Sequence, residues 1–227
     1  MTAQSLDELA QSTTKMPMDL SPAHKKLQQA VILHGHLQAL PAQIALQMRR
    51  SAGGDYQLVL ETYFSACLNA AKSCFYVLSN AGHPHFKGVF SQWRMTALDG
   101  PARARFNAMK ALRDDDVHFG VTGAEALPKM VEMDMHEMFN YTFHNSAIFG
   151  PPTMAEHTNP DGTIVRADAL QGTVGLYIVV GGDRLEATTA CAWFIDRLRA
   201  LLDAIDAAAA KSDATSSSSV LDNGSTA

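Results

Sequence analysis

The sequence predicts an α+β fold that is predominantly helical. Two observations carry this prediction: apolar residues recur at helical spacing before residue 113 and after residue 184, and they alternate with polar residues between 131 and 143. The predicted order is three helices, a three-stranded antiparallel β insert at about 129–182, and a last helix. That last helix is expected to return to the first three and to complete a four-helix bundle.

Residues that start and stop helices delimit the first two predicted helices. Ser21 and Pro22 suit the N-cap and the first helical position, and Pro41 is expected to bend or break this helix before it stops near Gly53-Gly54. A second helix is predicted from about Tyr56 to Ser79. Its predicted apolar face consists of Val59, Tyr63, Ala66, Ala70, Cys74, Val77 and Leu78.

Two further helices flank the β insert, after a short helical turn at about Phe86–Trp93. One starts at Asp99-Gly100-Pro101, and the last helix runs from about Leu185 to Ala208. On the first of these, Ala102, Phe106, Met109 and Leu112 are predicted to face inward. The last helix is predicted to bury Cys191, Phe194, Ile195, Leu198, Leu201 and Leu202.

The insert is predicted from alternation and from turn residues. Val131–Phe143 alternates apolar and polar residues, which is typical of a strand. Asn159-Pro160-Asp161-Gly162 predicts a turn. Thr163–Ala167 and Thr173–Val180 are predicted as two more strands with Gly172 near the turn between them, and Gly181-Gly182 is predicted to close the set. The methionines of this stretch (130, 133, 135 and 138) are interpreted as strand core, with an adaptable binding surface as the alternative.

Composition divides the chain into one domain and two tails. We expect a flexible N-terminal arm at 1–20, a single domain at 21–209 and a disordered, serine-rich tail at 210–227. The three cysteines have no disulfide pattern and are interpreted as small buried residues. With no secretory signal and no apolar run of about 18 residues, a cytoplasmic protein without a membrane span is expected.

The charge of the chain limits its partners. The formal net charge is -5 and the isoelectric point is about 5.9, so nonspecific nucleic-acid binding is disfavoured and no DNA-binding motif is present. His34 and His36 are two residues apart on a predicted helix and cannot share one metal. His83 and His85 lack a nearby third ligand. No metal and no cofactor are therefore expected.

The segment from Arg113 to His118 is the best candidate site. A permanent cation beside a group that titrates near neutrality suits phosphoryl chemistry, because the arginine can stabilise an oxyanion while the histidine moves protons. Three aspartates at a helix end oppose the helix dipole, so stability alone does not favour them. One geometric objection stands: five residues place Arg113 and His118 about 140° apart on a straight helix. A solvated, charged helix end is the alternative interpretation.

The helix carrying Leu112-Arg113-Asp114-Asp115-Asp116-Val117-His118 resembles the signature helix of the HEPN superfamily, and the resemblance covers roughly 55–208. It implies a homodimer whose cleft gathers motif residues from both chains, and metal-independent endoribonuclease activity in the active members. Arg113 would then hold the scissile phosphate, His118 would act as acid or base, and Asp114 would orient them. Asp115, Asp116 and the overall acidity depart from what an RNA substrate requires.

Three hypotheses follow from the sequence. The first is a HEPN-like, metal-independent endoribonuclease that acts on RNA through Arg113 and His118 at a dimer cleft. The second is a non-catalytic RNA- or protein-binding module, with a regulatory role, on the same scaffold. The third is a helical stress or defence protein whose β insert contacts a protein partner.

Overall fold

The computed structural model describes residues 20–50, 55–80, 86–119, 124–132, 155–167 and 170–221; the side chains at 48–50, 113–119, 155, 167, 171 and 212–221 lie outside the description. In this part the fold is α+β and mostly helical, as predicted. The elements follow in the order α1 (Ser21–Arg50), α2 (Tyr56–Asn80), α3 (Phe86–Thr96), α4 (Gly100–Phe119), β1 (Glu125–Glu132), β2 (Ala155–Thr158), β3 (Ile164–Ala167), β4 (Leu170–Val180), β5 (Asp183–Glu186) and α6 (Ala187–Leu221).

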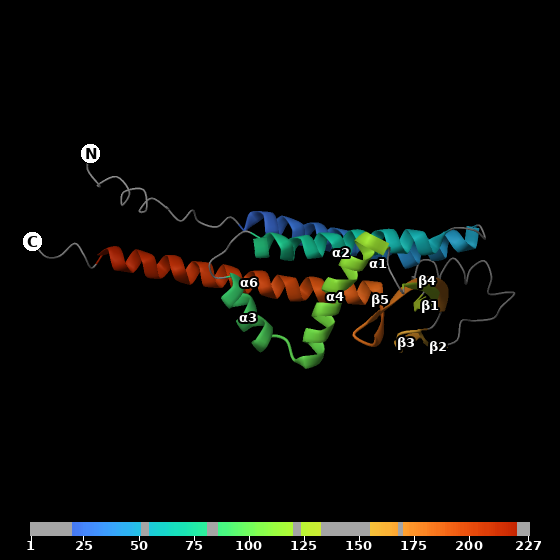
Figure 1. Ribbon diagram of the computed structural model, residues 1–227. Helices are drawn as coiled ribbons and strands as arrows, with labels where there is room; N and C mark the ends of the chain where they lie inside the picture. The colour runs from blue at the N-terminus through green and yellow to red at the C-terminus, as the bar shows by residue number, and fades with distance from the viewer. Residues whose placement is uncertain are drawn as a thin grey trace, which may run out of the picture.

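Three long helices form the body of the molecule. Helices α1, α2 and α6 all contact one another, and they run side by side along its length, with α4 crossing α6 and the strands gathered at the end where α6 begins (Figure 1). Helix α6 is the longest of the described helices, and all six of its predicted core residues are buried. Helix α4 and the strands are positioned by their packing against these three helices.

Helix α1 continues through Pro41 without a break, so the expectation that this residue breaks the helix is wrong. Proline removes one amide donor and crowds the preceding turn, but a tertiary contact holds the chain at this point. The hydroxyl of Thr173 in β4 donates a hydrogen bond of 2.6 Å to the Pro41 carbonyl. Both Thr173 and Pro41 are buried, so this bond ties the sheet to the helix in the interior.

Helix α2 forms where it was predicted, but its buried face is shifted by about one residue. Val59, assigned to the apolar face, is 40% exposed. The buried side chains are Leu60, Phe64, Cys67, Leu68, Ala71, Lys72, Cys74, Phe75 and Leu78. Helix α2 is covered by α1, α4 and α6 together, so its buried face is wide and is centred on its large leucine and phenylalanine residues rather than on its small ones.

An aromatic cluster attaches α3 and α4 to the long helices. The cluster consists of Phe75, Phe86, Phe90, Trp93, Phe106 and Phe194. The ring centroid of Phe106 lies 5.3 Å from that of Phe194 and 5.6 Å from that of Trp93. Helix α4 begins as predicted, because the Asp99 carboxylate accepts a hydrogen bond of 2.8 Å from the Ala102 amide. Phe106 and Met109 face inward, as predicted.

The strands differ from the predicted insert in their pairing. β1, β4 and β5 form a three-stranded antiparallel sheet with β4 in the centre, while β2 and β3 form a separate antiparallel pair. The predicted strand 131–143 coincides with β1 only at 131–132, and 133–143 lies outside the described residues. Residues 183–186 form β5, so Leu185 and Glu186, expected at the start of the last helix, lie in a strand instead. Gly181 and Gly182 have φ values of 64° and 95°, and such a two-residue turn returns the chain as a hairpin.

The last helix is longer than predicted. It ends at Leu221 rather than near Ala208, so residues 211–221, assigned to the disordered tail, are helical. Residues 1–19 and 222–227 lie outside the described part, where the expected arm and the rest of the tail stay predictions. No helix among the described residues combines the length and the apolar character needed to cross a membrane.

Candidate functional site

The predicted motif lies on the last turns of α4. This helix is continuous from Gly100 to Phe119, so the backbone does not break between Arg113 and His118. Helical geometry therefore keeps these two positions about 140° apart around the axis. The side chains of Arg113, Asp114 and His118 lie outside the described part of the chain, and their assignment as a site stays a prediction.

A buried lysine, which the sequence analysis missed, contacts α4 just before this motif. Lys72 of α2 is 2% exposed, and its ammonium group donates a hydrogen bond of 2.7 Å to the carbonyl of Lys110. Its Nζ also lies 5.2 Å from the centre of the Tyr76 ring. Lys72 thus packs against α4 one turn before Arg113. The signal in the sequence that could have found it is a lysine on an otherwise apolar face of a helix.

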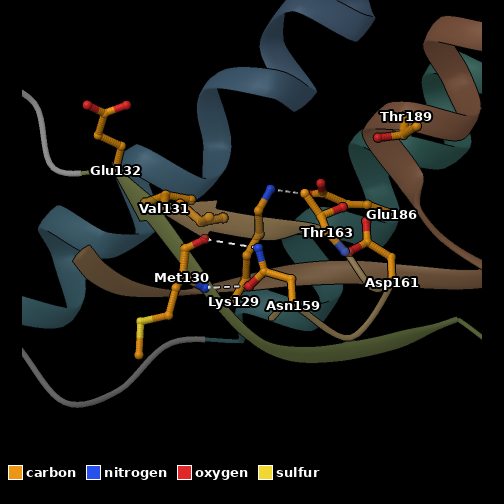
Figure 2. A pocket seen from close by; sticks show the side chains of 10 residues that line it. Lys129, Met130, Val131, Glu132, Asn159, Asp161, Thr163, Glu186 and Thr189 are labelled. Carbon is orange, nitrogen blue, oxygen red and sulfur yellow. Dashed lines mark hydrogen bonds and ion pairs between the residues drawn. The ribbon is translucent and has the colours of Figure 1, made fainter. Parts of the chain in front are cut away.

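A second polar region lies at the β end of the molecule. A cleft of about 300 Å³ opens where β1, the β2–β3 turn and the first turn of α6 meet (Figure 2). The residues lining it are Lys129, Met130, Val131, Glu132, Asn159, Asp161, Thr163, Val165, Glu186 and Thr189. Three carboxylates and one ammonium group among these give the cleft a negative balance of charge. This cleft was not predicted from the sequence.

An ion pair forms the inner part of the cleft. Lys129 Nζ donates to Glu186 Oε1 at 2.5 Å, and the two side chains are only 17% and 10% exposed. Lys129 lies opposite Thr173 in the β1–β4 register, and Glu186 lies opposite Tyr177 in the β4–β5 register. Two edge strands thereby place opposite charges on the same face of the sheet.

Gly175 leaves the room that this arrangement needs. A Cβ atom at Gly175 would lie 3.1 Å from the Tyr177 ring and 3.2 Å from Cδ of Lys129. The Tyr177 hydroxyl is buried and has no hydrogen-bond partner among the described residues. Burial raises the pKa of Tyr177, and the negative charges of Glu186 and Asp161 raise it further. The phenol therefore stays neutral beside the cleft.

Asn159 connects the β2–β3 turn to the edge of the sheet. Its side-chain oxygen accepts a hydrogen bond of 2.9 Å from the Met130 amide, and its side-chain nitrogen donates one of 3.1 Å to the Met130 carbonyl (Figure 2). One amide side chain thus occupies the place of a further strand on β1. The turn that contains Asn159 was predicted, but this contact across 29 residues was not. Met130 itself lines the cleft.

The histidines have separate partners. His34 Nε2 lies 2.9 Å from the Thr188 carbonyl, while the His36 ring packs beside Tyr63 at 6.2 Å between centroids. His83 and His85 lie outside the described residues. Within the described ranges, no three His, Cys, Asp or Glu side chains are grouped so that they could hold a metal ion.

Comparison of this chain with protein-family models, with curated proteins and with solved structures found no match. The resemblance to the HEPN superfamily therefore rests on the motif and helix order in the sequence itself.

Proposed function

We propose that this protein is a HEPN-like, metal-independent endoribonuclease that works as a homodimer. The observation that carries the proposal is the arrangement of α4: Phe106 packs against Phe75 of α2 and Phe194 of α6, and the same unbroken helix continues through Arg113 to His118. We assign α1, α2, α4 and α6 to the four helices of the proposed family's bundle. The three free, buried thiols suit a reducing, cytoplasmic compartment.

A dimer answers the geometric objection to the motif. On one straight helix the two positions diverge by about 140°, so a single α4 does not bring Arg113 and His118 to one phosphate. Two copies of α4 that meet at their C-terminal ends bring the arginine of one chain beside the histidine of the other. Arg113 then stabilises charge on the scissile phosphate, His118 transfers a proton as acid or base, and Asp114 orients the pair.

A non-catalytic RNA- or protein-binding module on the same scaffold is the second candidate. The charge of the chain favours the protein-binding form of this module, because a net charge of -5 and three adjacent aspartates repel a polyanion such as RNA. This module has no turnover, so its partner binding does not depend on the protonation of His118.

Cleavage of RNA in excess chelator separates the two candidates. The wild-type protein is expected to cleave, while His118→Ala and Arg113→Ala lose at least about 100-fold in rate, the usual size of a lost acid–base or oxyanion contribution. His24→Ala is the matched control, because His24 is exposed and pairs with Asp206 on α6 instead of lying on α4. A strict monomer in sedimentation, or intact RNA with every class of substrate, would overturn the nuclease proposal.

A further inference from the structure

Two arginines enclose a tryptophan where α4 meets α6. The guanidinium carbon of Arg105 lies 5.6 Å from the centre of the Trp193 ring, and that of Arg197 lies 5.7 Å from it. We call these three residues the arginine–tryptophan stack. All three side chains are partly buried. Cation–π contacts of this kind hold the planar guanidinium groups in fixed orientations while their outer edges reach solvent.

The arginine–tryptophan stack carries a surplus of positive charge on an acidic chain. Asp183, at 2.9 Å from Arg105, is the one carboxylate that pairs with it among the described ion pairs. For Arg197 the described part of the chain contains no ion pair, and its Nε has no hydrogen-bond partner there. Of the two guanidinium groups, only that of Arg105 is therefore paired with a carboxylate among the described residues. This local cluster is the kind of site that an acidic protein needs if it is to bind a polyanion.

We propose that the arginine–tryptophan stack binds the phosphate backbone of single-stranded RNA. A guanidinium group donates two parallel hydrogen bonds to one phosphate, and an arginine held against an indole loses little freedom on binding. The inference rests on the proposed function for the identity of the nucleic acid, and it assigns substrate binding to residues outside the catalytic motif.

The position of the arginine–tryptophan stack explains how RNA reaches an acidic motif. Arg105 precedes Arg113 by eight residues on α4, which corresponds to about 12 Å along the helix axis. One strand of RNA spans that distance. The stack therefore anchors the strand on the first half of α4, away from the aspartates at 114–116, and leaves only the scissile phosphate to enter the motif.

The test measures the affinity of the full-length protein for a fluorescein-labelled 20-nucleotide single-stranded RNA by fluorescence anisotropy. The His118→Ala background prevents cleavage by the proposed site, and chelator suppresses contaminating metal-dependent nucleases. Arg105→Gln and Arg197→Gln are each expected to weaken binding about 10-fold and to lower the slope of log affinity against log salt by about 1. The control is Arg199→Gln, because Arg199 is exposed on the same helix and already pairs with Asp196 at 2.7 Å. Equal affinity of Arg197→Gln and Arg199→Gln would overturn the inference.

A second measurement keeps the test independent of the stability of these variants. The chain has two tryptophans, so Trp93→Phe leaves Trp193 as the only indole. Its fluorescence is expected to change as the same RNA is added, and an unchanged spectrum at saturating RNA counts against the arginine–tryptophan stack. RNA that binds through the stack without being cleaved refutes the nuclease proposal alone. RNA that is cleaved equally well by Arg105→Gln and Arg197→Gln refutes the stack alone.

Discussion

The helical body and the β end of this protein are held together by different kinds of contact. Between the helices the contacts are apolar and many, and aromatic rings such as Phe106 and Phe194 share them. At the β end, single polar contacts join distant parts of the chain: Lys129 to Glu186, Asn159 to Met130 and Thr173 to Pro41. The stability of the helical body therefore comes from many apolar contacts together, whereas the stability of the β end depends on a few individual polar contacts.

The largest loss of stability is expected from Phe106→Ala. The Phe106 ring contacts Phe75, Trp93 and Phe194, so its removal leaves a cavity that three helices line. Such a substitution costs about 4 kcal/mol of unfolding free energy, measured by urea denaturation. Met95→Ala, at a side chain that is 70% exposed, is the control and should change stability by less than about 0.5 kcal/mol. Similar losses in the two variants would show that the aromatic cluster does not hold α4.

Breaking the buried ion pair is expected to have the next largest effect. Lys129→Met leaves the Glu186 carboxylate buried without its partner, and this costs about 3 kcal/mol. The double variant Lys129→Met/Glu186→Leu removes both charges and should regain most of that loss. A double variant as unstable as the single one would mean that the β end depends on packing, like the helical body.

An exposed ion pair supplies the matched control for the Lys129 experiment. Arg166 and Glu156 join β3 to β2 at 2.6 Å, and their side chains are 63% and 53% exposed. Arg166→Ala should cost less than about 1 kcal/mol, because solvent screens the pair. Both Arg166→Ala and Lys129→Met remove one charge of an ion pair, so the difference between their losses of unfolding free energy measures the effect of burial.

Asn159→Ala is expected to have a smaller effect than loss of the ion pair. The substitution removes two hydrogen bonds and leaves the amide and carbonyl of Met130 unsatisfied at a site where Asn159 is 4% exposed. The expected cost is about 2 kcal/mol. Amide hydrogen exchange at Met130 should also accelerate. Asn107→Ala, on the exposed face of α4, is the control, and equal exchange rates at Met130 in both variants would contradict the role of Asn159.

The sequence predicted the helical body better than the β end for a physical reason. The spacing of apolar residues along a helix indicates which face is buried, so the core residues of α6 and the inward-facing residues Phe106 and Met109 were predicted correctly. The face of α2 was misplaced because small residues do not show which neighbours cover a helix. The pairing of β3 was wrong because strand alternation contains no information about which strand is the partner.

The two candidate regions differ in the same way. The Arg113–His118 motif is a local pattern and could be noticed, whereas its predicted function depends on a second chain. The cleft depends on Lys129, Asn159 and Glu186, which are distant in the sequence and individually ordinary. Lys72 and Trp193 lie on predicted helices, but neither was singled out from the sequence. Residue spacing within one helix can be recognised from the sequence, but a contact made by folding cannot.

Alkaline pH is expected to weaken the helical body before the β end. Burial raises the pKa of Cys74 from 9.0 to about 12, so the folded state keeps a proton that the unfolded state releases. This contribution to stability is complete below pH 9 and is lost as the pH rises toward 12; the loss is about 1 kcal/mol at pH 10. Tyr177 at the β end follows above pH 10, because burial and then Glu186 and Asp161 raise its pKa.

Urea unfolding at pH 8 and pH 10 measures this difference between the two regions. Cys74→Ala should reduce the loss of stability between these pH values by about 1 kcal/mol, whereas Tyr177→Phe should change it less, because the tyrosine begins to contribute only at higher pH. Cys191 adds a loss of the same sign, since its pKa is raised by its interaction with Cys67 and by burial. If Tyr177→Phe removed more of the loss than Cys74→Ala, the β end would be the region that responds first, and the comparison between the two regions would be reversed.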